Sequence, residues 1–446
     1  MRVEATYSEI WRISWPIILS SLANTVINFT DVAFVSRIGE KELAASALGG
    51  VFYFMLVMAG TAIGIGSQIL ISRRAGENRH PDIGGIFDHS LCILFSFAVL
   101  MMAVVYGLMP LFMNGIVKDP EVAAHVIRYL DARCWGLVFM MLLIALRSFY
   151  TGITLTRIIT YTTLVMMILN LILNYAFVLG HFGFEPMGIY GSGLASALAE
   201  GAAALYAILY TFFRSTLKEY RLFKFRNMNL NDTLQILQLS APVVLQHVLS
   251  MGSWFLFFVM IEKLGSRELA LSNIVRGIYM VLMTPIWGFS QSANSMVSNL
   301  IGQAKEKEVM GLLKKIMTMS ILTGIAGILL SMLFRDFLFS LTTPDARLME
   351  DAMGSFYVVC LATFFFTISM VLLSGISGTG ATAAAMFIEI ICLVVYVAYV
   401  LVFTILLPAP LETVWGAEVL YWLMMGLISY HYLRSGKWLR TALKYN

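Results

Sequence analysis

The chain has 446 residues, of which 59% are hydrophobic and 13% are charged, and its mean hydropathy is +0.82. Soluble domains carry roughly a quarter charged residues, so this composition excludes a water-soluble fold. The net charge of +4, without a dense run of Lys and Arg, argues against nucleic acid as a partner. The partner that such an apolar chain requires is the lipid bilayer.

Twelve apolar runs follow one another, each long enough to cross the roughly 30 Å hydrocarbon layer of a bilayer. The first run continues past Asp31 without a small-residue cleavage site, so we interpret it as a retained helix and not as a signal peptide. The pattern predicts an all-α integral membrane protein of about twelve transmembrane helices. They are expected at residues 13–36, 42–72, 84–116, 122–152, 158–180, 190–213, 236–261, 268–300, 308–340, 350–376, 383–408 and 413–434.

The distribution of Lys and Arg predicts how the chain is oriented in the membrane. With the N-terminus inside, the cytoplasmic segments hold 20 Lys and Arg residues and the external loops hold 7. Positively charged loops remain in the cytoplasm. We therefore expect a multi-pass protein of the cell's inner (plasma) membrane with both termini cytoplasmic.

The two halves of the chain are repeats of each other. A shift of 226 positions aligns GEKELAAS, from Gly39, with GSRELALS, from Gly265, and pairs Pro16 with Pro242. Across residues 16–76 this shift gives 12 identities in 61 ungapped positions. Six helices is an even number, so both copies have the same orientation across the membrane. The predicted architecture is two pseudo-symmetric six-helix bundles related by an axis along the membrane normal.

The repeat predicts the domain boundaries. We expect an N-terminal bundle over residues 1–213 and a C-terminal bundle over residues 236–434. The longest polar stretch, residues 214–235, is the predicted cytoplasmic linker, and residues 435–446 form a cytoplasmic tail.

Asp31 is the most informative residue, because it lies inside the first predicted helix. An ionised carboxylate within a bilayer costs roughly 2.5–3.5 kcal/mol on insertion scales. Asn24 and Asn28 stand seven and three residues earlier, on the same face of that helix. The alternative, a purely structural hydrogen bond, is less favoured because a neutral Asn would serve it at lower cost.

Two further helices place oxygen-bearing side chains at i, i+4 spacing, which puts each pair on one helix face. These pairs are Asn170 with Asn174, and Ser196 with Glu200. One carboxylate among amide and hydroxyl oxygens suits Na⁺ or a proton better than Ca²⁺. Interhelical packing is the alternative role for both pairs.

The second half lacks the acidic pattern of the first. The 226-residue shift maps Asn24, Asn28 and Asp31 onto Ser250, Trp254 and Phe257. The remaining polar candidates for substrate contact or coupling in this half are Gln246, His247, Arg276, Gln291, Asn294 and Glu389, with Glu262 at a helix end. A buried ion pair or a charge facing lipid headgroups is the alternative for Arg276 and Glu389.

No catalytic or cofactor motif accompanies these residues. The chain has no Gly-rich phosphate loop, no HExxH and no GxSxG, and its four cysteines stand singly. We expect no enzyme activity and no cofactor besides a coupling ion. Pro16, inside the first predicted helix, predicts a kink there, which serves either as a hinge or as a static bend.

Several segments together are similar to those of a known family. They are the stretch from Pro16 to Asp31 leading into SRIGEKELAA, followed by GSQILISRRAGE, NLILNY, GIYGSGLASALAE, APVVLQ, SNLIGQ and SGISGTGAT. Over essentially its whole length the chain resembles the multidrug and toxic compound extrusion family of antiporters. The resemblance implies two six-helix bundles that alternate between outward-facing and inward-facing states, with Na⁺ or H⁺ entry driving export of organic cations.

The resemblance also implies roles for individual residues. The family's first-helix acid corresponds to Asp31, its cation-binding partners to Asn170, Asn174 and Ser196, and its kinking proline to Pro16. The chain departs from the family where one branch has a Glu in the seventh helix and an Asp in the tenth. Here those places hold Ser250 and the surroundings of Phe366 and Thr367, and Ser377 and Ala381 replace an Arg and an Asp of the signature that follows.

These observations predict a secondary active antiporter that exports small organic, cationic compounds in exchange for Na⁺ or H⁺. The cation, if Na⁺, would bind at Asp31, Asn170, Asn174 and Ser196. The alternatives are a flippase for lipid-linked oligosaccharides or a related amphiphile, and a membrane receptor or scaffold without transport. We expect the protein to work as a monomer.

Overall fold

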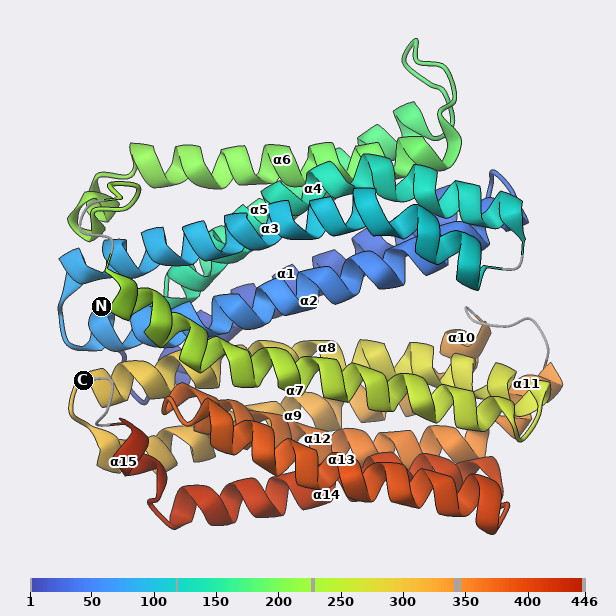
Figure 1. Ribbon diagram of the computed structural model, residues 1–446. Coiled ribbons are helices and arrows are strands. Elements are labelled where there is room, and N and C mark those ends of the chain that lie inside the picture. Colours follow the sequence, from blue (N-terminus) through green and yellow to red (C-terminus); the bar gives the residue numbers. More distant parts are fainter. Residues whose placement is uncertain (1, 118, 226–228, 341–345, 443–446) are drawn as a thin grey trace. The chain divides into compact units, whose positions relative to one another are not determined.

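The structure is a computed structural model that describes residues 2–117, 119–225, 229–340 and 346–442, and its regular elements in these ranges are all helical (Figure 1). The long helices, which build the fold, are α1 (Tyr7–Val35), α2 (Glu40–Gly76), α3 (His80–Ile116), α4 (Pro120–Gly152), α5 (Arg157–Phe177), α6 (Gly188–Phe213), α7 (Leu230–Glu262), α8 (Ser266–Gly302), α9 (Val309–Leu333), α12 (Met353–Gly378), α13 (Thr382–Leu401) and α14 (Leu411–Arg434). Shorter elements are η1 (Ser215–Tyr220), η2 (Glu306–Glu308), α10 (Arg335–Ser340), α11 (Ala346–Asp351), η3 (Val402–Leu406) and α15 (Trp438–Ala442).

The prediction of twelve membrane-spanning helices is confirmed, since twelve helices in the described ranges are long and apolar enough to cross a bilayer. Several boundaries are wrong: the helix expected at 308–340 ends at Leu333, where the short α10 follows from Arg335, and the helix expected at 383–408 ends at Leu401. The charged neighbours Arg335 and Asp336 end the apolar run of the first of these two helices. Helix α1 also starts at Tyr7, six positions before the predicted start at residue 13.

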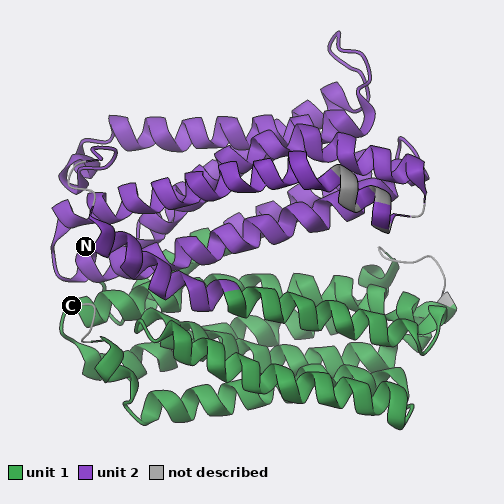
Figure 2. Ribbon diagram, viewed as in Figure 1, with its two compact units in different colours: residues 1–18, 245–446 green, residues 19–244 purple. Residues whose placement is uncertain are grey.

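The chain divides into two compact units, coloured separately in Figure 2. One unit contains residues 19–244, and the other contains residues 1–18 and 245–446. In the first, α4 packs against α2, α3 and α6, and α5 packs against α6. In the second, α12 packs in the same way against α8, α9 and α14, and α13 packs against α14. The predicted pair of pseudo-symmetric six-helix bundles is therefore present.

Each unit contains the beginning of the other half's first helix. Residues of α1 up to Ile18 belong with the second half, and residues of α7 up to Val244 belong with the first half. These two crossing points are 226 positions apart, and each lies two residues beyond a proline, Pro16 or Pro242. The predicted boundaries 1–213 and 236–434 follow the sequence repeat. In the packing, however, residues 1–18 and residues 230–244, here called the two arms, each join the bundle of the other half.

Equivalent contacts hold the two arms. Ser14 in α1 donates to Ser292 Oγ in α8 at 2.9 Å, and Ser240 in α7 donates to the carbonyl oxygen of Ile63 in α2 at 3.0 Å. Ser14 and Ser240 are partners in the 226-residue repeat. Gly66, the repeat partner of Ser292, has no room for a Cβ, because the Ser240 side chain and the Ile236 carbonyl lie against it. Small residues thus permit close helix contact at both places.

The predicted linker, residues 214–235, contains ordered structure. It holds η1, and the backbone N–H groups of Phe223, Lys224 and Phe225 donate to the Asp88 carboxylate at 2.8–3.0 Å. Helix α7 begins inside it, where the Asn229 side chain accepts from the N–H of Asn231 at 3.0 Å. Residues 226–228 of the linker lie outside the described ranges.

The described segments nearest the two chain ends belong to the same unit and lie at the same end of it (Figure 1). The backbone of Val3 is held by the side chains of Asn299 and Gln303, at 3.1 and 3.0 Å. The predicted tail, residues 435–446, contains α15, and its last residues, 443–446, lie outside the described part of the chain. A common side for both ends agrees with an even number of spans.

Gly191 lets α6 approach the end of α5. A Cβ at this position would lie 2.8 Å from the backbone carbon and oxygen of Phe177, which cannot move without shifting α5. We expect Gly191→Ala to lower the free energy of unfolding by about 1–3 kcal/mol, the usual effect of overpacking. Thermal unfolding in detergent measures this. The matched control is Gly85→Ala on α3, where a Cβ would meet nothing within 4 Å; equal melting of the two variants would contradict the prediction.

Candidate functional site

Asp31 lies near the end of α1 and is held by two other helices. Its Oδ1 accepts a hydrogen bond from Asn174 Nδ2 on α5 at 2.7 Å, and its Oδ2 accepts one from Ser196 Oγ on α6 at 3.3 Å. The carboxylate is partly buried. Three helices therefore meet at a single acidic side chain, and all of these contacts lie in the unit of residues 19–244.

The amide and hydroxyl groups around Asp31 also bind one another. Asn170 Nδ2 donates to Ser196 Oγ at 3.1 Å, and Asn174 Nδ2 donates to Asn170 Oδ1 at 3.1 Å. Both Asn side chains are buried, at 1% and 0% exposed. The structure thus brings together the four residues that the sequence singles out for cation coupling. The i, i+4 spacing of Asn170 and Asn174 is what turns both side chains toward α1 and α6.

One oxygen of this cluster is unused. Asn174 Oδ1 is buried and has no hydrogen-bond partner among the described residues. A buried acceptor without a partner costs about 1–3 kcal/mol. It provides a place for a cation or a donor beside the Asp31 carboxylate.

The donor set limits which ions fit. The described residues contain no group of three or more His, Cys, Asp and Glu side chains arranged to hold a metal ion. A single carboxylate with neutral oxygens from Asn170, Asn174 and Ser196 has the charge and ligand type for one monovalent cation. A proton would need only a carboxylate oxygen of Asp31. Both coupling ions considered from the sequence are compatible with this arrangement.

Next to this cluster lies an ion pair. Arg133 Nη2 on α4 lies 2.7 Å from Glu200 Oε1 on α6. Tyr53 on α2 donates its hydroxyl to Glu200 Oε2 at 3.0 Å, and the Arg133 guanidinium lies 3.9 Å from the centre of the Tyr53 ring. The sequence identifies Glu200 as a candidate, but it assigns no role to Arg133. Its position inside a predicted helix was the available signal, because a charge within a span needs a partner.

Other predicted residues of the first half lie apart from these contacts. Asn28 is exposed and Asn24 is half-buried, and neither is bonded to Asp31 in the described structure. Pro16 lies within α1. It precedes by two residues the point at which α1 passes from one unit to the other.

In the second half, Glu389 on α13 is the centre of a smaller cluster. The Gln246 side chain on α7 donates to Glu389 Oε2, and Tyr421 on α14 donates to Glu389 Oε1 at 3.1 Å. Arg276 is exposed, and its guanidinium lies 5.0 Å from the centre of the Phe258 ring. The structure therefore groups two of the predicted candidates, Gln246 and Glu389, and its described residues show no ion pair between Arg276 and Glu389.

The other candidates of this half are distributed elsewhere. Asn294 on α8 is buried and donates to the Ser374 carbonyl oxygen at 3.4 Å, and Gly378 lies against its backbone. Gln291 is half-buried on the same helix. Glu262 is the last residue of α7 and is exposed.

Glu418 on α14 is a buried acid that the sequence interpretation missed. Its Oε1 accepts from Trp254 Nε1 at 3.2 Å and from the Tyr396 hydroxyl at 3.0 Å. Its Oε2 accepts from the Tyr279 hydroxyl and from Trp422 Nε1, both at 3.0 Å. Four neutral donors thus surround one carboxylate, and the described ion pairs give it no cationic partner.

The two buried acids, Glu200 and Glu418, are held in a similar way, although they are 218 and not 226 positions apart. Tyr53 and Tyr279 are 226 positions apart, and each donates its hydroxyl to the glutamate on the last long helix of its half at 3.0 Å. The charge is balanced differently, since Arg133 compensates Glu200 whereas tyrosine and tryptophan donors surround Glu418.

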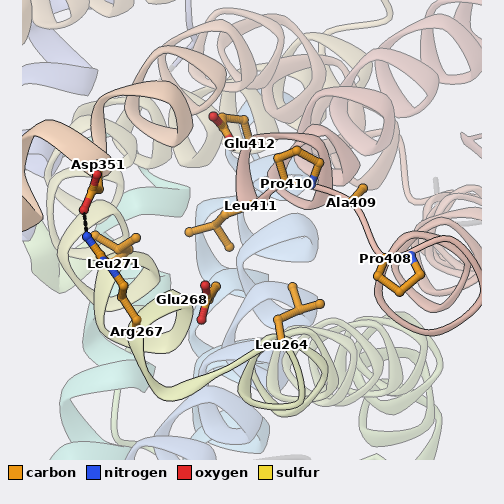
Figure 3. A pocket seen from close by; sticks show the side chains of 10 residues that line it. All are labelled: Leu264, Arg267, Glu268, Leu271, Asp351, Pro408, Ala409, Pro410, Leu411 and Glu412. Carbon is orange, nitrogen blue, oxygen red and sulfur yellow. Dashed lines mark hydrogen bonds and ion pairs between the residues drawn. The ribbon is translucent and has the colours of Figure 1, made fainter.

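A pocket of about 510 Å³ lies at the loop ends of the second half (Figure 3). It contains the ion pair between Arg267 and Asp351 and the carboxyl groups of Glu268 and Glu412. None of the residues predicted for the site lines it. Its lining residues are Leu264, Arg267, Glu268, Leu271, Asp351, Pro408, Ala409, Pro410, Leu411 and Glu412.

The fold and the buried charges define a membrane transporter built from a repeat. The family model MatE matches this chain twice, over residues 16–176 and 242–402. The two matches start 226 positions apart, which is the predicted repeat. The chain therefore belongs to the MatE family of multidrug and toxic compound extrusion transporters, which are transporters and not enzymes.

Individual relatives agree with this membership. The chain is 24% identical over 318 residues to the "Probable multidrug resistance protein NorM" of Agrobacterium fabrum, covering 70% of this chain and 66% of that protein, just under two thirds of its length. It is 25% identical over 360 residues to the protein of the same name from Photorhabdus laumondii, covering 79% and 77%. The solved structure described as the outward-facing conformation of a multidrug resistance MATE family transporter superposes with a TM-score of 0.86. That match is at 19% identity and covers 98% of this chain and 96% of the other.

Proposed function

We propose that this protein is a secondary active antiporter that exports small organic cations in exchange for Na⁺ or H⁺, with Asp31 as the coupling residue. The observation that carries the proposal is the placement of the Asp31 carboxylate between Asn174 and Ser196, beside the unpartnered Asn174 Oδ1. An acid kept at such a position in an apolar bundle marks an ion pathway more often than a structural contact.

The cluster supports antiport because a bound coupling cation changes the charge at Asp31. A cation bound at Asp31 neutralises the carboxylate and satisfies Asn174 Oδ1, so the bound and free states differ in charge and in hydrogen bonding. We propose that binding from outside favours closing or bending of the first bundle and weakens substrate binding, so that substrate leaves outward. Each net charge entering down 100 mV supplies roughly 2.3 kcal/mol.

Two features support cationic substrates. The buried carboxyl groups of Glu389 and Glu418 accept hydrogen bonds from neutral donors, and the described ion pairs include neither of them. Aromatic rings line both acids, and such rings attract organic cations. The relatives are named for multidrug resistance. That name gives no support to the flippase or to the receptor without transport.

The experiment that tests this function is efflux from proteoliposomes containing the purified protein, with ethidium as the probe. A Na⁺ gradient and a pH gradient are imposed separately. We expect ethidium transport against its gradient under one of them and none without a gradient. Transport that does not depend on either gradient would contradict cation-coupled antiport, whereas the responding gradient identifies the ion.

We also propose that both termini lie in the cytoplasm, that the protein resides in the inner membrane and that it works as a monomer. The excess of Lys and Arg on the side of the termini supports the orientation. Labelling of single cysteines introduced at the two ends, with an impermeant reagent on intact cells, tests it. Labelling before lysis would contradict a cytoplasmic location.

A further inference from the structure

Arg133 carries a positive charge next to the Asp31 cluster, so it can compete there with a coupling cation. Ser196, which binds Asp31, and Glu200, which binds Arg133, are four residues apart on α6. They are therefore separated by about 6 Å along the helix. The guanidinium interacts electrostatically with Asp31 as well as with Glu200. A permanent cation of the protein is thus paired with α6 about one helical turn from the residue that binds the Asp31 carboxylate.

One nitrogen of the guanidinium is unused. Its Nη2 pairs with Glu200, and its face lies on the Tyr53 ring, whereas its Nη1 is buried without a hydrogen-bond partner in the described structure. Arginine presents its donors in a fork that matches a carboxylate. The free Nη1 is therefore able to bind a second carboxylate if the contact with Glu200 is lost.

Glu200 is fixed in turn. Tyr53 donates to its second oxygen at 3.0 Å, and a Cβ at Gly136 would strike both the Glu200 carboxylate and Arg133 Nη1. The absence of a side chain at Gly136 is thus what leaves room for the ion pair between α4 and α6. Tyr53, Arg133 and Glu200 come from three helices of one unit, so the contact is built into its packing.

We propose that Glu200, assisted by Tyr53, holds the Arg133 guanidinium away from Asp31 and thereby keeps Asp31 available to the coupling cation. Glu200 and Tyr53 are positioning residues in this scheme, and Arg133 is the internal competitor. The inference rests on the proposed function, because it assumes that a cation binds Asp31. It adds that the apparent affinity for the cation depends on the ion pair between Arg133 and Glu200, which does not contact the cation.

The test compares three variants in the gradient-driven ethidium assay with the full-length protein. Glu200→Gln frees Arg133 to bind Asp31, so we expect export to fall about tenfold or more and the half-saturating cation concentration to rise. Glu200→Gln combined with Arg133→Gln removes the competitor, and export should return to within about threefold of wild type, as expected for two strongly coupled residues. A merely structural role for Glu200 would not be reversed by a second substitution.

Arg133→Gln alone gives an independent measurement. Removing a positive charge near Asp31 should lower the half-saturating cation concentration by about tenfold, because the two cations no longer repel each other. The matched control is Arg128→Gln, which removes an exposed arginine from the same helix and should leave this concentration unchanged. Melting temperatures in detergent show whether each variant is folded.

Three results would overturn the inference: normal export by Glu200→Gln, a folded double variant no better than the single one, or an unchanged or higher half-saturating concentration in Arg133→Gln. If the double variant does not fold, the half-saturating cation concentration of the Arg133→Gln variant decides. Asp31→Asn in the same assay separates the two proposals. Normal export by Asp31→Asn contradicts the proposed function, whereas loss in Asp31→Asn with normal Glu200→Gln contradicts this inference alone.

Discussion

Replacing Asp31 by Asn should abolish gradient-driven export while leaving the protein folded. The side-chain carbonyl of the introduced asparagine can still accept the hydrogen bond that Asn174 donates at 2.7 Å, so the packing of α1 against α5 survives. The charge is lost, however. Two opposite charges about 4 Å apart attract by about 4 kcal/mol at an effective dielectric constant of 20, so Na⁺ binding should weaken about a thousandfold. A proton likewise loses its carboxylate.

The control for this variant is Asp131→Asn, which changes an exposed acid on α4 that lies outside the cluster. Ethidium efflux under each imposed gradient is measured for both proteins, with a thermal melt to establish folding. Export by Asp31→Asn at the wild-type rate under both gradients would remove Asp31 from the coupling step. Residual export without a gradient in the variant would show instead that substrate binding survives the loss of coupling.

The Glu418→Gln variant should be markedly less stable than the wild type. The carboxylate accepts hydrogen bonds from Trp254, Tyr279, Tyr396 and Trp422. A glutamine oxygen can accept two of these bonds, whereas the amide nitrogen faces two donors that lose their acceptor. Each buried donor without a partner costs about 1–3 kcal/mol, so the free energy of unfolding should fall by about 2–6 kcal/mol.

Thermal unfolding in detergent measures this loss, with two comparisons. Glu389→Gln affects a carboxylate that accepts from Gln246 and Tyr421, fewer donors than surround Glu418, so its effect should be smaller. Glu262→Gln changes an exposed residue at the end of α7 and should melt like the wild type. A Glu418→Gln protein as stable as Glu262→Gln would show that the four donors find other acceptors.

The helices were largely predictable because membrane insertion imposes a length and a composition on every span. The apolar runs place all twelve spans, and the even number per repeat gives two bundles of the same orientation. The ends were harder, because they depend on local contacts. The start of α7 at Leu230 is set by capping from Asn229, and the end of α9 by the charged residues after Phe334.

For the candidate site, spacing predicted the faces but not the contacts. The i, i+4 pairs identified Asn170 with Asn174 and Ser196 with Glu200, yet the meeting of their helices with α1 depends on tertiary packing. The same limit explains Asn28, which shares a helix with Asp31 but is exposed. A shared helix face does not imply a shared partner.

The partners of Arg133 and of the buried acid Glu418 could not be predicted from the sequence. Arg133 and Glu418 both stand inside predicted spans, so the cost of burying a charge applied to them as it did to Asp31. That cost indicates that a partner exists without identifying it. The partners lie 67 residues away for Arg133 and as far as 164 for Glu418, and no local pattern connects such positions.

The exchange of the first part of α1 and of α7 bears on how such a chain can arise and be divided. Neither half contains every segment of its own unit, since residues up to Ile18 belong with the second half and the start of α7 up to Val244 belongs with the first. Fragments cut within the linker would each lack an arm that the other carries, so they should complement each other when produced together. A single ancestral repeat could complete its bundle as a domain-swapped homodimer, in which two copies exchange the first parts of their first helices.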